Sequence, residues 1–141
     1  MSAIEIRLMK IDDYDEVFHL WLSTPGMCLR NYDDSAEGIA KFLKKNPTSN
    51  FVALDENRIV GVVLSSNDGR RGYIYHATVH PDYRNRGIAQ SLMKEVYCEL
   101  KKEGIRKAGL LVLKDNEIGN GFWKSQKWDN REELNYYSKN L

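Results

Sequence analysis

Apolar and polar residues follow two different periods along this chain. Over residues 4–8, apolar side chains alternate with Glu5 and Arg7, which predicts a half-buried strand. Over residues 87–103, apolar side chains recur at helical spacing and Gly104 follows, so we expect a long amphipathic helix that ends there. Residues 108–113 are almost all apolar, which is typical of a strand buried on both faces. The chain is therefore predicted to mix strands and helices.

The remaining elements follow from the same patterns and from the turn residues between them. Three successive antiparallel strands and then a strand–helix–strand crossover predict a mixed α+β, α/β-like fold with helices on both faces of one sheet. The sheet is expected to be mostly antiparallel, with six to seven strands, and its two parallel strands splay apart to leave a ligand cleft. Residues 1–141 are expected to form one domain. The further predicted strands and helices are strands at Phe51–Leu54, Arg58–Ser65, Tyr73–Val79 and Leu134–Ser138, and helices after Asp12, after Ser35 and over Asn116–Gln126.

Composition narrows the classes of function. The chain is 42% hydrophobic and 29% charged with a net charge of +1, so no global field attracts it to nucleic acid or to a membrane. No apolar run is long enough to cross a bilayer and no signal-peptide pattern is present, so a cytoplasmic protein is expected. Cys28 and Cys98 lack the spacing of a metal or redox motif, and we expect no metal.

The most informative motif lies between the strand at 73–79 and the helix at 87–103. Arg84, Gly87 and Ala89 occupy the three fixed positions of the pattern R/Q-x-x-G-x-G/A, directly before the helix. A helix N-terminus presents backbone N–H groups and the positive end of the helix dipole, both of which favour phosphate. Gly87 also allows the backbone to approach an anion closely. The segment is therefore predicted to bind a phosphate-bearing cofactor.

These residues resemble the GNAT superfamily of N-acetyltransferases, and the resemblance covers almost the whole chain. Arg84 to Ala89 fit that family's acetyl-CoA pyrophosphate signature. Asn116 to Trp128 resemble its second signature, N-x-x-A-x-x-F-Y-x-x-x-G-F. Leu29-Arg30 to Asp33 are similar to a segment of small, poorly characterised bacterial members. The resemblance implies the GNAT fold, with a CoA cleft between the splayed parallel strands.

The resemblance also implies which residues bind acetyl-CoA, the acetyl donor. Backbone N–H groups of the turn would hold the pyrophosphate, Val79 would pair with the peptide-like pantetheine arm, and Asn116 would hydrogen-bond to pantetheine. The predicted cofactor-binding residues are Thr78, Val79, Arg84, Asn85, Arg86, Gly87, Ile88, Ala89, Asn116, Gly119, Phe122 and Trp123.

Proton transfer is encoded less clearly than cofactor binding. An ammonium with a pKa of about 10.4 must lose a proton before its nitrogen attacks, which costs about 4–5 kcal/mol at pH 7. The family's usual acid is a Tyr, but this chain has Trp123, whose indole N–H is no useful acid. The candidate catalytic residues are His76, Tyr75, Tyr73 and Trp123. As alternatives, His76 faces solvent or packs within the sheet, and the two tyrosines form a cleft wall.

The resemblance implies that the acceptor binds at Trp21 to Asp34, because GNAT enzymes usually form the acceptor wall there. Trp21, Arg30, Tyr32 and Asp33 are the candidate acceptor-binding residues, and Arg30 would suit a carboxylate on the acceptor. A helix cap is the alternative role for Asp33 or for Asp34.

These observations favour an N-acetyltransferase that moves acetyl from acetyl-CoA to a primary amine of a small molecule or peptide. We expect direct attack in a ternary complex, because neither Cys28 nor Cys98 lies beside a base in the predicted elements. A monomer or a homodimer would suit the sequence. A non-catalytic acyl-CoA-binding or sensing module is the alternative, since Trp123 replaces the usual Tyr. The near-neutral charge argues against a third possibility, an RNA-binding domain.

Overall fold

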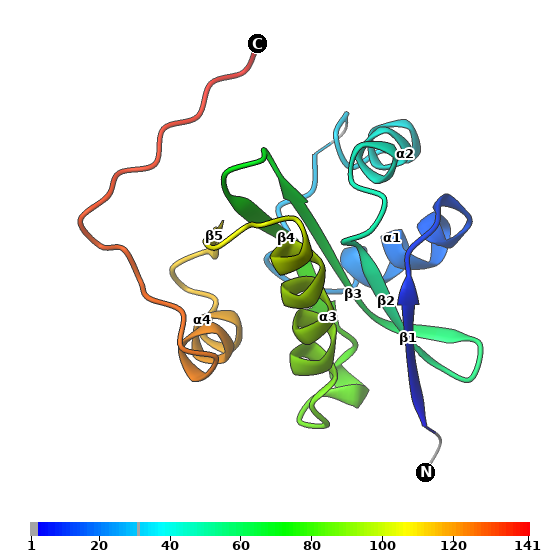
Figure 1. Ribbon diagram of the computed structural model, residues 1–141. Helices are drawn as coiled ribbons and strands as arrows, with labels where there is room; N and C mark the ends of the chain where they lie inside the picture. The colour runs from blue at the N-terminus through cyan, green and yellow to red at the C-terminus, as the bar shows by residue number, and fades with distance from the viewer. Residues whose placement is uncertain (1–2, 31) are drawn as a thin grey trace. The chain divides into compact units, whose positions relative to one another are not determined.

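The computed structural model of the chain describes residues 3–30 and 32–141 (Figure 1). These residues separate into two compact units, one that ends at Leu111 and one from Val112 onward, and each is described by itself. The second unit contains the helix α4 (Glu117–Ser125). The elements of the first unit are β1 (Ile4–Leu8), η1 (Ile11–Asp13), α1 (Tyr14–Leu22), α2 (Ala36–Lys45), β2 (Phe51–Asp55), β3 (Arg58–Asn67), β4 (Gly72–Val79), η2 (Pro81–Tyr83), α3 (Ile88–Lys102) and β5 (Ala108–Leu110).

The strands of the described chain form one sheet in the order β1-β2-β3-β4-β5. Neighbours from β1 to β4 are antiparallel, whereas β4 and β5 are parallel and are connected through α3. The parallel pairing runs from Gly72 opposite Ala108 to Ile74 opposite Leu110. This topology confirms the predicted mixed, mostly antiparallel sheet with one parallel pair after the long helix.

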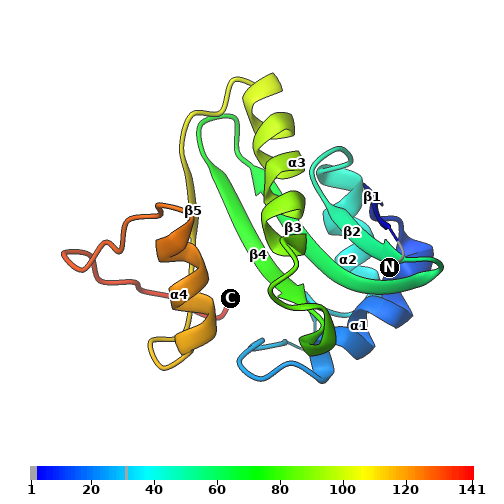
Figure 2. The same ribbon diagram turned by 90° about the horizontal axis from the view of Figure 1, so that it is seen from below.

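Helices of the first unit cover both faces of the sheet, as predicted (Figure 2). On one face, Val17 and Trp21 of α1 and Ile39 of α2 are buried in a cluster with apolar side chains of β2 and β3. The side chains of Val17, Trp21 and Ile39 are at most 2% exposed, so the hydrophobic effect holds α1 and α2 against this face.

The helix α3 lies against the opposite face at two glycines of the sheet. A Cβ added to Gly61 would lie 3.2 Å from Cδ1 of Leu92, and one added to Gly72 would lie 2.9 Å from Cδ1 of Leu100. Side chains at these positions would push α3 away from β3 and β4. The start of α3 is therefore held close to the end of β4, where the predicted phosphate-binding turn lies.

The strand β4 contains one residue more than the part of β3 that it pairs with. The pairs Leu64–Tyr75 and Val62–Thr78 enclose one residue of β3 but two of β4, the first of which is His76. His76 has a φ of 47°, in the left-handed region that β-strands normally avoid. This arrangement is a β-bulge, which bends a strand and redirects a side chain.

The strand predicted over residues 108–113 is shorter than expected, because β5 ends at Leu110. The prediction was wrong for its last three residues. The bulge in β4 begins directly after Tyr75, and it bends the edge that a longer β5 would need for pairing. Leu111 and Leu113 are accordingly 57% and 45% exposed rather than buried.

The strand predicted over Leu134–Ser138 is absent from the described residues, so the sheet has five strands rather than six to seven. Tyr136 and Tyr137 are 68% and 86% exposed. An apolar or aromatic segment forms a strand only where it finds a partner strand and a face to bury. Within its own unit this segment finds neither, which is why the residue types alone misled the prediction.

Asp13 connects β1 to the start of α1. Its carboxylate accepts hydrogen bonds from both terminal nitrogens of Arg7, at 2.8 and 2.9 Å, and from the backbone N–H of Lys10 at 2.9 Å. Burial by itself would raise the pKa of Asp13, but the bonds from Arg7 and Lys10 outweigh it and lower the pKa. Asp13 therefore contributes to stability as a carboxylate.

We predict that Asp13→Asn lowers the free energy of unfolding at pH 7 by about 1–2 kcal/mol, because charge-assisted hydrogen bonds contribute this much where one partner is partly exposed. The folded-state pKa of Asp13 lies below its unfolded value, so the stabilisation is present above about pH 4 and is lost as the pH falls through the folded pKa. Urea denaturation at pH 7 and at about pH 3 measures this. A difference between variant and wild type that grows on acidification would contradict the assignment.

Candidate active site

The turn between β4 and α3 brings the predicted phosphate-binding residues together. Arg84 is extended, whereas Asn85 and Gly87 have positive φ values of 61° and 76°. The helix α3 begins at Ile88 with Gly87 as its N-cap, and among the described residues no side chain caps it. A Cβ added to Gly87 would meet no atom within 4 Å, so the space beside the helix N-terminus is open. The first N–H groups of α3 are thus available to an anion.

Tyr83, which precedes the motif, connects the turn to β2 and packs against the side chain of Arg86. Its hydroxyl donates a 2.5 Å hydrogen bond to Oδ2 of Asp55 at the end of β2, and this bond is the main reason that the pKa of Tyr83 is raised. The guanidinium carbon of Arg86 lies 4.8 Å from the centre of the Tyr83 ring. Arg84 is half-buried, and in the described part of the chain it pairs with no carboxylate. The turn therefore presents two cations while Tyr83 holds its backbone in place.

Four predicted cofactor-binding residues near the turn are available chiefly through their main chain. Ile88 is 4% exposed because it packs against the sheet at Gly61. Thr78 is 5% exposed, and its hydroxyl donates to the carbonyl of His76 at 3.0 Å and contacts Sδ of Met27 at 3.2 Å. Val79 and Ala89 are half-buried. Little of the Ile88 and Thr78 side chains is therefore left for a ligand, and these two residues could contact one only through their main chain.

His76 is held by a carboxylate from a distant part of the chain. Its Nε2 lies 2.8 Å from Oδ1 of Asp34, which is in the loop between α1 and α2. Asp34 also accepts from the backbone N–H of Arg30 at 2.8 Å. Burial by itself would raise the pKa of Asp34, but the hydrogen bonds from His76 and Arg30 outweigh it, so the pKa is lowered. Of the alternatives left by the sequence, His76 is therefore packed against the sheet and the loop, and it is paired.

Trp21 lies behind His76 and does not face the surface. It is 1% exposed, and its ring centre lies 4.9 Å from that of His76 in an edge-on arrangement. Among the described residues, its indole nitrogen has no hydrogen-bond partner. Trp21 was predicted to contact the acceptor, but in this structure its buried ring packs against His76 instead.

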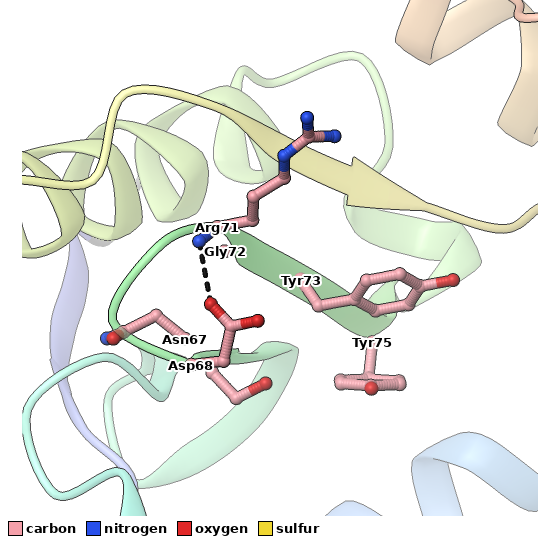
Figure 3. Close-up of a pocket in the computed structure, with 7 residues that line it drawn as sticks. Asn67, Asp68, Arg71, Gly72, Tyr73 and Tyr75 are labelled. Atoms are coloured by element: carbon pink, nitrogen blue, oxygen red, sulfur yellow. Dashed lines mark hydrogen bonds between the residues drawn. The ribbon is translucent and has the colours of Figure 1, made fainter.

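Tyr73 and Tyr75 line a cavity of about 280 Å³ beside the turn that connects β3 to β4 (Figure 3). Their ring centres are 4.8 Å apart, and Tyr75 also packs edge-on against Phe42 of α2. Across from them, the Asn67-Asp68 turn is closed by a 2.8 Å hydrogen bond from the Arg71 N–H to Oδ1 of Asp68. The two tyrosines therefore form an aromatic wall on the α1/α2 side of β4, next to His76.

A second cavity, of about 380 Å³, lies between α1 and the loop that follows it. Arg30 and Asp34 line it together with apolar side chains that include Phe18 and Leu29. Of the other predicted acceptor-binding residues, Tyr32 is 70% exposed and Asp33 is exposed. The helix cap expected from Asp33 or Asp34 comes from Ser35, whose hydroxyl oxygen accepts from the Gly38 N–H at 3.0 Å, which leaves Asp34 to bind His76.

The other predicted cofactor-binding residues lie in the second unit, and they are Asn116, Gly119, Phe122 and Trp123. Oδ1 of Asn116 accepts from the Gly119 N–H at 2.9 Å and caps α4, and a Cβ on Gly119 would lie 2.7 Å from Nδ2 of Asn116. Trp123 packs edge-on between Phe122 and Trp128, with ring centres 4.9 and 5.2 Å apart. Asn116 therefore has a structural role in its own unit, and Trp123 belongs to an aromatic cluster.

Sequence reasoning missed the roles of three residues in this site: Asp34 as the partner of His76, and Tyr83 with Asp55 as the anchor of the turn. Asp34 was recognised only as a possible cap, because adjacent acidic residues before a helix usually indicate one. No sequence pattern connects residues that are 42 positions apart, as Asp34 and His76 are.

Comparison with known proteins identifies the family. A model of the acetyltransferase (GNAT) family matches residues 14–128, which include the turn, the bulge and α4. The chain belongs to the GNAT acetyltransferases. An acetyltransferase of Yersinia pestis (strain Pestoides F) is 33% identical over 131 residues, which are 93% of this chain and 92% of the relative. These matches confirm the predicted family and enzyme class: the chain is an acetyl-CoA-dependent N-acetyltransferase.

Solved GNAT structures share the fold at lower sequence identity. The PaiA N-acetyltransferase of Thermoplasma acidophilum, solved with coenzyme A, is 18% identical with a TM-score of 0.76, and the match covers 88% of both chains. An aminoglycoside acetyltransferase from an uncultured soil metagenomic sample, solved with sisomicin, is 20% identical with a TM-score of 0.75 and covers 98% of this chain and 96% of its own. Among the described residues of this chain, no helix could span a membrane and no cluster of three acidic, His or Cys side chains could hold a metal.

We predict that Tyr83→Phe loosens the turn without unfolding α3, because the variant loses the bond to Asp55 and keeps the ring under Arg86. Amide hydrogen exchange should become faster at residues 84–87 and remain slow in the middle of α3. Tyr137→Phe, which changes an 86% exposed tyrosine, is the matched control and should alter neither region. Unchanged exchange at residues 84–87 in Tyr83→Phe would show that the bond does not anchor the turn.

Proposed function

We propose that this GNAT enzyme transfers acetyl from acetyl-CoA to a primary amine of a small molecule or peptide, by direct attack within a ternary complex. The observation that supports the donor half is the β4–α3 turn, in which an uncapped helix N-terminus lies beside Arg84 and Arg86. Backbone N–H groups, the helix dipole and two guanidinium groups together favour a pyrophosphate over a neutral ligand.

The cofactor would extend from this turn along β4. The strand continues to Val79, beyond its last pairing with β5 at Ile74, so its edge offers main-chain groups to the amide units of pantetheine. The thioester would then lie near the bulge at His76. The roles of Asn116, Gly119, Phe122 and Trp123 at the pantetheine stay predictions from the family resemblance.

The acceptor would approach from the α1/α2 side of β4. There the aromatic wall of Tyr73 and Tyr75 offers ring faces, which attract an ammonium group. Arg30, Tyr32 and Asp33 lie on the neighbouring loop, where we propose that they contact the rest of the acceptor. The sisomicin complex of the metagenomic neighbour supports amines as the class of acceptor.

The reaction does not require a covalent enzyme intermediate. Holding the amine and the thioester together supplies up to about 7–11 kcal/mol of the barrier reduction. Among the described residues, Cys28 and Cys98 are both exposed and neither is paired with a base. Direct attack therefore needs only positioning and a group that takes the ammonium proton.

We predict that purified protein releases free thiol from acetyl-CoA only when a primary amine is present. A panel of polyamines, aminoglycosides, amino acids and peptides, followed with a thiol reagent, measures this, and the products are identified by mass. The tertiary amine triethanolamine is the matched negative control. Tight acetyl-CoA binding with no thiol release on any amine would contradict the proposed transfer and favour a sensing module.

Substitution of Gly87 tests the donor site. Gly87→Leu should weaken coenzyme A binding at least tenfold, because the new side chain would occupy the open space that the phosphates need. Gly104→Leu is the matched control: Gly104 ends the same helix, has a φ of 78° and is also surrounded by open space. Both variants carry the same backbone strain, so calorimetric titration of each separates strain from binding. Equal affinities in the two variants would contradict the site.

A further inference from the structure

The carboxylate of Asp34, in the loop between α1 and α2, contacts the imidazole of His76, and we place the thioester near this imidazole. We propose that Asp34 is a positioning residue that holds His76 with its proton on Nε2, so that Nδ1 is the general base for the acceptor amine. This inference rests on the proposed amine acetylation and goes beyond it, because it assigns the base, its reactive atom and the group that orients it.

The contact between the two side chains is direct and largely shielded from solvent. Nε2 of His76 lies 2.8 Å from Oδ1 of Asp34, and the side chains are 17% and 9% exposed. The second oxygen of Asp34 accepts from the Arg30 backbone N–H, and the carbonyl of Asp34 accepts from the Tyr14 hydroxyl at 2.7 Å. The carboxylate is thus fixed at both oxygens and at its own backbone. The carboxylate cannot rotate away from His76 without breaking the bond from the Arg30 N–H.

The protonation state of Asp34 decides which nitrogen of His76 carries the proton. The pKa of Asp34 is lowered, so near neutral pH the group is a carboxylate and can only accept hydrogen bonds. Nε2 of His76 must therefore be the donor. In the neutral imidazole the lone pair is then on Nδ1, and among the described residues no group donates to Nδ1.

The Nδ1 lone pair of His76 lies at the bulge in β4. Residue 76 is the first residue of the bulge, and its φ of 47° is a strained value for a histidine. The Trp21 ring packs edge-on against the imidazole and restricts its movement. Tyr75, the preceding residue, belongs to the aromatic wall of the acceptor side. The imidazole therefore projects from the bulge, directly after Tyr75 of the aromatic wall, on the strand whose edge we propose for pantetheine.

The charged and titratable groups around His76 come from few elements. Asp34 faces it from the loop, with the charge of Arg30 acting on Asp34, and Tyr75 precedes it on β4. The helix α1 contributes Trp21, which does not titrate, and Tyr14, which bonds to the Asp34 backbone. Asp34 is consequently the one anionic group among the described residues that contacts the ring.

The proposed step balances protons and bonds. Nδ1 takes one proton from the acceptor ammonium and gives an imidazolium paired with the Asp34 carboxylate. The neutral nitrogen attacks the thioester carbonyl carbon, the C–N bond forms and the C–S bond breaks. The second proton of the nitrogen passes through water to the thiolate sulfur, and the imidazolium releases its proton to solvent. Acetylated amine, coenzyme A thiol and one proton result.

The tautomer can be measured without any turnover. In protein labelled with 15N-histidine, at a pH above the histidine titration range, long-range 1H–15N spectra should show His76 with its proton on Nε2. The His76→Gln variant assigns the signal by its loss. His19 is an internal reference, because its Nδ1 lies 2.7 Å from the Asp15 carbonyl, an acceptor, and must carry the proton there. A proton on Nδ1 of His76 in the wild type would overturn the proposal.

Activity with the best amine of the panel tests the role in catalysis. Asp34→Asn keeps the shape and removes the charge, so kcat should fall by about tenfold to a hundredfold while the KM for acetyl-CoA stays unchanged. Asp13→Asn, which removes a buried carboxylate paired with Arg7, is the matched control and should change neither.

The two sets of results separate the possible failures. A wild-type kcat in folded Asp34→Asn would overturn the positioning role, and so would a kcat that falls together with acetyl-CoA affinity, because a merely structural contact would not separate the two. A His76→Gln variant with full activity would overturn the assignment of the base. If no amine is acetylated by the wild type, the proposed function fails, whereas the NMR measurement still decides whether Asp34 sets the tautomer of His76.

Discussion

Between Tyr75 and Thr78, β4 contains one residue more than the stretch of β3 beside it, and this bulge determines where the site can form. The pairing with β5 stops just before it, so the strand edge beyond Ile74 extends past its neighbour. The bulge also directs His76 toward the loop between α1 and α2, where Asp34 binds it. One local irregularity thereby places the main-chain edge that we propose for the donor and the imidazole that we propose as the base at the same point of the sheet.

The two halves of the proposed site are stabilised in different ways. The donor turn depends on backbone conformation: positive φ at Asn85 and Gly87, an uncapped helix and an anchor from Tyr83 to Asp55. Because the ligand contacts that we propose for it are main-chain groups, many sequences could build it. The acceptor side depends on side chains from α1, α2 and their connecting loop, and therefore on the particular residues of this chain. This difference explains why GNAT enzymes can share a donor and differ in their acceptors.

Much of the fold and the donor turn could be predicted from the sequence, because periodicity and a local motif encode them. The strand alternation of residues 4–8 and the helical spacing of residues 87–103 depend only on neighbours in the chain. The short β5 and the unpaired segment at Leu134–Ser138 depend on which edges are available after folding, which no local pattern records. For the same reason the sequence does not predict the Asp34–His76 pair, although it marks Asp34 as a possible helix cap and His76 as a possible base.

In the proposed function, the β4–α3 turn and the bulge of β4 hold the two ends of one acyl-CoA molecule. A crystal structure with a non-hydrolysable thioether analogue of acetyl-CoA tests this most directly. We expect the pyrophosphate within hydrogen-bond distance of the backbone N–H groups between Arg86 and Ala89, with the acyl carbonyl beside His76. A pyrophosphate bound elsewhere, or an acyl group remote from His76 with the cofactor fully ordered, would contradict it.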